Sequence, residues 1–86
     1  MVKIFAKIIK NHKTVKSITY NNVNEYQSED FYFYLSEICR KLELSTPITV
    51  DYHRESFEKF NMVKYMPDDF VDSFDFDSLI LENIDL

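Results

Sequence analysis

Apolar and polar residues alternate over the first twenty positions of the chain. Residues 2–10 place an apolar side chain at every second position, and the opposite face carries lysines together with Phe5 and Ile9. A period of two predicts a strand. Residues 13–20 predict a second strand because they are rich in β-branched side chains. Residues 11–12 are a polar turn, so the sequence predicts a β-hairpin. We expect its loop to exceed two residues slightly, since it lacks the Asn-Gly pair that the shortest loops prefer.

A helical period begins after a polar loop at residues 21–27. Ser28 is a candidate N-cap, and two acids follow it in the first turn, where the helix dipole favours negative charge. The pattern predicts one long helix over about residues 29–43. Its apolar stripe consists of Phe31, Leu35, Ile38 and Leu42. Tyr32 and Phe33 lie off that stripe.

The second half of the chain predicts shorter elements. Pro47 keeps the residue before it out of helical geometry, and residues 48–50 form a short extended run. A second helix is predicted over about residues 52–60, with Asp51 as its cap. A brief strand follows at residues 62–66, and then a single helical turn that starts at Pro67. The last strand, residues 76–84, is apolar on both faces near its centre, which is typical of a strand inside a sheet.

These elements predict one α+β domain over residues 1–86. Their order is an N-terminal β-hairpin, one long helix, a short irregular or helical segment and a C-terminal strand. That order is typical of a β-grasp-like mixed sheet of three to four strands, in which the first and last strands are central neighbours. The pattern leaves open whether residues 44–75 contribute a strand.

The composition excludes several classes of binding site. The 86 residues contain no glycine, and the loops that cradle nucleotide phosphates or calcium need glycine at their tight bends. We therefore expect no cofactor. The single cysteine cannot form an internal disulfide, and no apolar run approaches the roughly 20 residues that span a membrane. We expect a cytoplasmic protein with no membrane partner.

Charged residues are arranged in blocks along a chain whose net charge is −5. Residues 1–24 hold five lysines and no acid, whereas residues 66–86 hold seven acids and no base. If the two segments pair in one sheet, their charges partly neutralise each other. Alternatively, an acidic patch forms an exposed face that imitates nucleic-acid phosphates. That patch comprises Asp68, Asp69, Asp72, Asp75 and Asp77.

Few residues offer catalytic chemistry. A nucleophile needs a base positioned next to it, and Cys39, beside the apolar stripe, is expected to be a buried and inert thiol. His12 in the hairpin turn and His53 in the short helix can each approach a carboxylate, as most histidines can. The acids near the C-terminus match the spacing of no known metal loop. We therefore expect no enzyme and no metal site.

Apolar residues outside the predicted core are the main functional clue. Tyr32 and Phe33 lie off the helix stripe, and Phe5 and Ile9 lie on the second face of the first strand. If helices cover only one side of the sheet, an apolar open face of the kind that marks a protein interface is formed by Phe5, Ile9, Leu79 and Leu81. Alternatively, the second helix covers this face and buries it.

The function predicted from these features is a small non-enzymatic protein–protein interaction module that self-associates. Its protein partner would be a second copy in a homodimer, the commonest oligomer. The alternative is an acidic inhibitor, of a type carried by mobile elements or phages, that mimics nucleic acid. We do not expect direct nucleic-acid binding, because the net negative charge repels a polyanion at a distance.

Several short segments are similar to a known group of proteins. Residues 44–48 (Leu-Ser-Thr-Pro-Ile), Phe57, Phe60, the pair Asp69-Phe70 and residues 75–77 (Asp-Phe-Asp) carry the likeness. The chain resembles short uncharacterised proteins from Firmicutes, of clostridial type, which begin with a similar lysine-containing hairpin. Those proteins have no assigned activity. The resemblance therefore implies a bacterial, cytoplasmic protein and transfers no functional residue.

Overall fold

The alternating pattern of β1 (Val2–Lys10) organises the sheet. Its even-numbered residues as far as Ile8 are buried, and its odd-numbered residues are half-buried on the other side. β1 pairs antiparallel with β2 (Lys13–Asn22) along one edge and with β4 (Ser78–Asn83) along the other. β3 (Met62–Tyr65) pairs antiparallel with β4. The computed structural model describes residues 1–85 and contains a four-stranded sheet in the order β2-β1-β4-β3.

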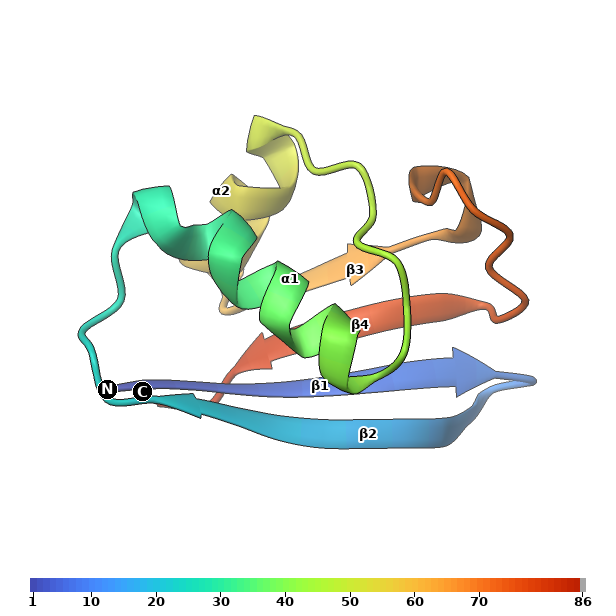
Figure 1. The fold of residues 1–86 in the computed structure, drawn as a ribbon, viewed down its shortest axis with the longest axis horizontal. Helices are drawn as coiled ribbons and strands as arrows, with labels where there is room; N and C mark the ends of the chain where they lie inside the picture. Colours follow the sequence, from blue (N-terminus) through green and yellow to red (C-terminus); the bar gives the residue numbers. More distant parts are fainter. Residues whose placement is uncertain (86) are drawn as a thin grey trace.

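Both helices lie on the same side of the sheet (Figure 1). The helical elements are the 3-10 turn η1 (Ser28–Asp30), α1 (Phe31–Lys41), α2 (Asp51–Phe60) and a second 3-10 turn, η2 (Pro67–Asp69). Side chains of α1 and α2 and one face of every strand form a single buried cluster. In the described part of the chain, the opposite face of the sheet carries no helix. Met1 and Asp85 lie close together at one end of the molecule, with the terminal amino nitrogen 3.9 Å from Asp85 Oδ2 (Figure 1).

The predicted α+β class is confirmed, as are the N-terminal hairpin and the central pairing of the first and last strands. Residues 62–65 add the fourth strand that the sequence left open. One detail is wrong: the sheet is antiparallel throughout, not mixed. α1 runs in the direction of β1, and α2 then carries the chain back, so β3 runs with β1 and β4 runs against it (Figure 1).

The hairpin turn is shorter than expected. Lys10 pairs with Lys13, so Asn11 and His12 alone form the loop. Both have positive φ, 52° for Asn11 and 64° for His12, as a two-residue turn between right-twisted strands requires. An exposed histidine thus occupies a position that glycine usually fills.

Left-handed backbone recurs at two helix ends of this glycine-free chain. Glu43 (φ 61°) follows α1, and Asn61 (φ 59°) follows α2. At the end of α1, the Leu44 N–H donates to the Cys39 carbonyl (2.8 Å) and the Glu43 N–H donates to the Arg40 carbonyl (3.1 Å). This pair of bonds is a Schellman motif, whose left-handed residue is most often glycine.

We predict that Glu43→Gly stabilises the protein. A Cβ atom raises the free energy of the left-handed conformation by about 1–2 kcal/mol, so its removal should stabilise the folded state. The greater freedom of glycine in the unfolded chain offsets part of this stabilisation. A net gain of about 1 kcal/mol corresponds to a rise in Tm of about 4–8 °C for a domain of this size. Thermal unfolding followed by circular dichroism measures it.

Glu43→Ala is the matched control for this substitution. It removes the same carboxylate, including the exposed ion pair with Lys16 (3.8 Å), but keeps the Cβ atom. If the glycine variant melts no higher than the alanine variant, the Cβ atom at this left-handed position does not lower the stability of the protein.

Candidate functional site

The side of the sheet without helices carries charged and apolar side chains in alternation. Phe5 lies opposite Glu82, and Lys7 lies opposite Ile80 in the next row. Lys7 and Glu82 form an ion pair across the diagonal, with Nζ and Oε1 3.2 Å apart. We call this surface the open side. It consists of Lys3, Phe5, Lys7, Ile9, Met62, Lys64, Ile80 and Glu82.

The structure places Phe5 and Ile9 on the open side, where both are half-buried. Leu79 and Leu81 do not join them, and this part of the prediction is wrong, because both side chains are buried in the core. Leu81 is 0% exposed and lies opposite Ala6, in the helix-covered core. The reason is the register: Phe5 pairs with Glu82, so the next residue along β4 faces the other way. Because β4 is apolar on both faces, its sequence alone does not identify the buried one.

The helix-covered side carries the more exposed apolar residues. Tyr32 and Phe33 project from α1 as the stripe predicts, and they lie on the opposite side of the sheet from Phe5 and Ile9. The structure therefore does not bring the predicted interface residues together. We call the exposed apolar group on this side the helix-side surface. Its members, each 52–64% exposed, are Tyr32, Phe33, Ile48, Val50 and Tyr52.

Sequence reasoning missed three members of the helix-side surface. Residues 48–50 read as a short extended run, but they form no strand. The Ile48 N–H donates to the Asp69 carbonyl (2.7 Å) instead of to a neighbouring strand. An extended apolar run without a strand partner leaves Ile48 and Val50 exposed. The sequence feature that could have identified this exposed run is the series of β-branched residues directly after Pro47.

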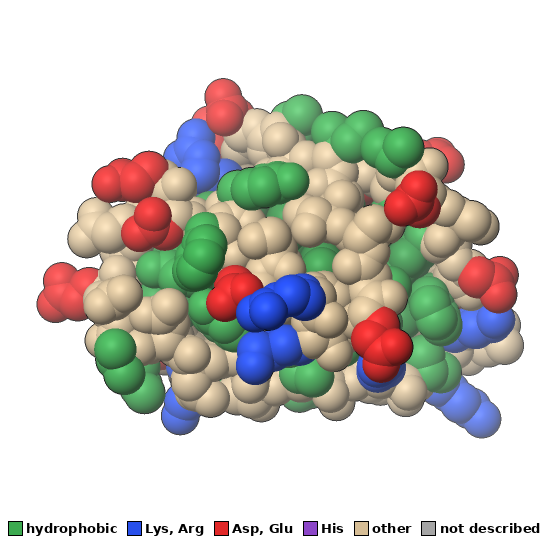
Figure 2. Space-filling view, in the orientation of Figure 1, with side chains coloured by type: hydrophobic (Ala, Val, Ile, Leu, Met, Phe, Trp, Pro, Cys, Tyr) green, Lys and Arg blue, Asp and Glu red, His purple; other side chains and the backbone are tan. Residues whose placement is uncertain are grey.

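A groove of about 410 Å³ lies between η1 and the start of α2. Tyr32 and Val50 form apolar parts of its lining, and Glu29, Asp51 and Arg54 add charged groups. On the side shown in Figure 2, hydrophobic side chains form several separate patches, and both acidic and basic side chains lie between them. The groove is therefore a mixed surface and not a closed apolar cavity.

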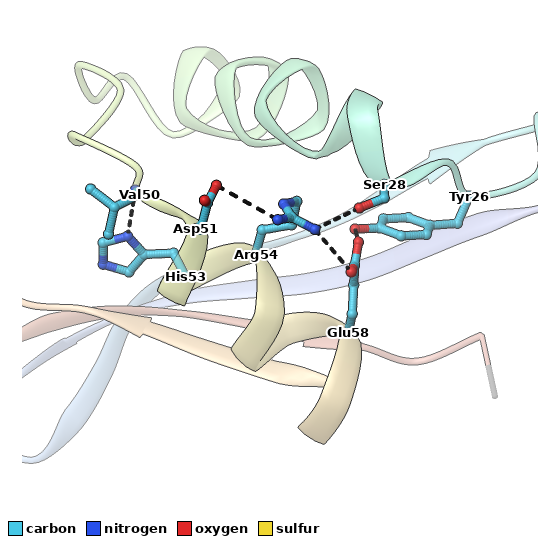
Figure 3. Close-up of polar contacts among 7 residues, drawn as sticks. All are labelled: Tyr26, Ser28, Val50, Asp51, His53, Arg54 and Glu58. Carbon is cyan, nitrogen blue, oxygen red and sulfur yellow. Dashed lines mark hydrogen bonds and ion pairs between the residues drawn. The ribbon is translucent and has the colours of Figure 1, made fainter.

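Arg54 connects the two elements that border the groove (Figure 3). Its Nη1 donates to the Ser28 hydroxyl (2.9 Å) and to Glu58 Oε1 (3.4 Å), while its Nη2 lies 3.6 Å from Asp51 Oδ1. The Tyr26 hydroxyl donates to the other Glu58 oxygen at 2.7 Å. These contacts hold η1 against α2 and fix the width of the groove.

The same network shifts two ionisation equilibria. Burial acts to raise the pKa of Glu58, but hydrogen bonds from Ser28 and Tyr26 and the charge of Arg54 outweigh it, so the pKa lies below its usual value. Burial, followed by the hydrogen bond and charge of Glu58, raises the pKa of the Tyr26 phenol. The carboxylate is therefore charged and the phenol neutral at pH 7.

His53 has structural roles. It is 8% exposed, and its ring stacks on that of Tyr65 with centroids 4.4 Å apart. The Val50 N–H donates to Nδ1 of His53 (3.1 Å), and the His53 N–H donates to the Val50 carbonyl (3.0 Å), which caps the start of α2 (Figure 3). Nε2 lies 3.8 Å from Asp69 Oδ2. The cap predicted at Asp51 is thus supplied by His53.

The other two candidate groups for chemistry also lie in structural positions. Cys39 is 0% exposed, and burial raises its thiol pKa to about 12. A protonated thiol in a closed core is a poor nucleophile. His12 is exposed at the tip of the hairpin, on the left-handed backbone described above.

Three of the five aspartates in the predicted acidic patch bind groups within the molecule. Asp75 contacts Lys10 Nζ at 3.4 Å, Asp77 accepts the Asn11 N–H at 2.8 Å, and Asp69 accepts the Met66 N–H at 2.8 Å. Asp68 and Asp72 are exposed. The pairing between the lysine-rich hairpin and the acidic segment is therefore observed in part. This arrangement adds no support to the nucleic-acid mimic, which stays a prediction.

Among residues 1–85, no group of three or more His, Cys, Asp or Glu side chains is arranged to hold a metal ion. None of the helices in this range has the length and apolar character needed to cross a membrane.

We predict that Cys39 is unreactive in the folded protein. At pH 8 its high pKa and its burial should make reaction with Ellman's reagent at least roughly a hundredfold slower than in the unfolded chain. The control is the same protein in about 6 M guanidinium chloride, which exposes the thiol. Rapid labelling of the native protein would contradict the buried position of Cys39.

We predict that Glu58 contributes to the loss of stability in acid. Because its folded-state pKa is lowered, its stabilisation is present above the unfolded value of about 4.3 and is lost as the pH falls through the folded value. Glu58→Gln should cost about 1 kcal/mol at pH 7. It should also reduce the drop in Tm between neutral and acid pH.

Glu55→Gln is the control for the pH experiment, since Glu55 is exposed on the same helix and has no ion-pair partner among residues 1–85. It should leave the pH dependence of Tm unchanged. Equal acid sensitivity in wild type and Glu58→Gln would refute the role of Glu58.

Comparison with known proteins adds no family to this description. No family model, no curated protein and no solved structure matches the chain. The resemblance to the Firmicutes group therefore stays a prediction.

Proposed function

We propose that this chain is a non-enzymatic protein-interaction module that self-associates through the helix-side surface. The observation that carries the proposal is the group of five apolar side chains on this surface, each more than half exposed. Monomeric proteins commonly expose single apolar residues. Two of the five, Tyr32 and Val50, line the same groove, and exposed apolar side chains at a groove are typical of a binding surface. Aromatic residues such as Tyr32 and Tyr52 are enriched at such surfaces.

We also propose that the protein is not an enzyme, because three side chains that could take part in catalysis are engaged within the fold. His53 uses Nδ1 to cap α2, Cys39 is closed off in the core, and the Asp69 carboxylate accepts a backbone N–H. An active site needs a nucleophile or base that can reach a substrate. These groups are engaged in holding the fold.

A cytoplasmic location and a bacterial source complete the proposal. Cys39 is a free thiol, and a lone unpaired cysteine suits a reducing compartment. The bacterial source rests on the resemblance to the Firmicutes proteins.

We predict that the double variant Tyr32→Gln, Phe33→Gln weakens self-association. Removing an aromatic anchor from an interface costs about 1–2 kcal/mol, so the dissociation constant should rise at least roughly tenfold. Sedimentation equilibrium between about 10 μM and about 1 mM should show the mass of the wild type rising with concentration, with the rise displaced to higher concentration in the variant.

Val23→Gln is the matched control. Val23 is 85% exposed and lies in the loop after β2, outside the helix-side surface. This variant should associate like the wild type. A wild type that is monomeric at every concentration would refute self-association.

A further inference from the structure

We propose that self-association is heterologous: the open side of one copy packs against the helix-side surface of the next. The inference rests on the proposed function, because it names the partner surface for the helix side. The two surfaces lie on opposite sides of the same sheet and differ in charge.

The open side has a surplus of positive charge. Lys7 is neutralised by Glu82 at 3.2 Å. Lys3 and Lys64 have no acidic partner within 4 Å among residues 1–85. This surface is therefore basic in a molecule whose net charge is −5.

Apolar groups lie between these lysines. Phe5 and Ile80 are half-buried, and Met62 is exposed beside them. Phe5 and Met62 flank Glu82 in one row of the sheet, and Lys7 and Lys64 flank Ile80 in the next. The long stems of lysine can lie along such apolar groups and keep the ammonium groups free for contact with a partner.

The helix side carries more acids than bases around the groove. Glu29 is exposed and has no basic partner within 4 Å among residues 1–85. Glu29 and Asp51 border the groove together with Arg54, whose guanidinium is already engaged by Asp51 and Glu58. The apolar groups Tyr32 and Val50 lie among these acids. The helix-side surface therefore suits a basic and apolar partner.

Charge complementarity distinguishes the possible arrangements of two copies. A two-fold contact between open sides would bring lysines against lysines, and a two-fold contact between helix sides would bring acids against acids. Like charges across an interface cost binding free energy. Only the combination of one open side with one helix side places Lys3 and Lys64 near Glu29 and Asp51.

The molecule measures 33 × 23 × 22 Å, so the rectangle that encloses one side of the sheet covers roughly 750 Å². A contact with the ~800 Å² per partner of a standard interface would therefore occupy almost the whole side. A heterologous contact leaves one unused surface of each kind at the ends of the assembly. It therefore produces rings or open chains and does not stop at a dimer.

The test uses two variants that each damage one surface. Lys3→Glu, Lys64→Glu changes the open side, and Tyr32→Gln, Phe33→Gln changes the helix side. Each variant alone should stay monomeric under conditions in which the wild type grows beyond a dimer. An equimolar mixture should form a one-to-one dimer and nothing larger, because each variant supplies the surface that the other lacks.

Folding is controlled within the experiment, since a variant that recovers association in the mixture presents a folded surface. Circular dichroism melts of each variant add a second control. Lys13→Glu and Asp72→Lys reverse charges at exposed positions outside both surfaces, and both should assemble like the wild type. Raising the salt concentration should weaken assembly of the wild type by screening the contact.

The outcomes separate this inference from the proposed function. A monomeric wild type refutes self-association itself. If only one of the two variants loses association, the contact joins two identical surfaces, and the heterologous arrangement is overturned while self-association stands. The basic, aromatic open side could instead contact a polyanion. Binding of a labelled single-stranded oligonucleotide that is lost in the open-side variant would overturn the inference.

Discussion

Both helices cover the same side of the sheet, and this arrangement determines which side chains of the sheet are exposed. The covered side takes the alternate residues of four strands into one core, so the remaining residues of β1, β3 and β4 must face outward without a second layer. An antiparallel sheet tolerates this because one face can be solvated. The lysines and Glu82 keep the open side hydrated while Phe5 and Ile80 remain between them. In the proposed assembly, the solvated open side is also the surface that binds the next copy.

The helix layer is held together by polar contacts at its border. Arg54 joins η1 to α2, and His53 fixes the first turn of α2 through Val50. Both side chains are of types that catalytic sites use, yet in this molecule their donors and acceptors are engaged by neighbouring elements. The groove beside Tyr32 owes its shape to these contacts, so the residues that stabilise the helix layer also shape the surface for which we propose a binding role.

Local periodicity predicted most of the fold and the part of the site that depends on one element. The exposure of Tyr32 and Phe33 follows from the helical stripe, which is a property of α1 alone. The position of Leu81 depends on which face of β4 meets the helices, and a strand apolar on both faces does not encode that choice locally. The exposure of Ile48 and Val50 was not predicted, because the sequence of an extended run does not show whether another strand lies beside it. The cap by His53 likewise depends on the tertiary placement of the residues before α2.

The central pairing of β1 with β4 also determines when the molecule can fold. Ile4 pairs with Asn83 and Ile9 pairs with Ser78, so the middle of the sheet joins the two ends of the described chain. Contacts between residues so far apart in sequence carry a high entropy of loop closure and slow the folding of a domain. As the chain emerges from the ribosome, the hairpin and both helices are complete while one edge of β1 still lacks its partner. The core closes only once β4 is available to pair with β1, so the hairpin and both helices cannot complete their packing before β4 has been synthesised.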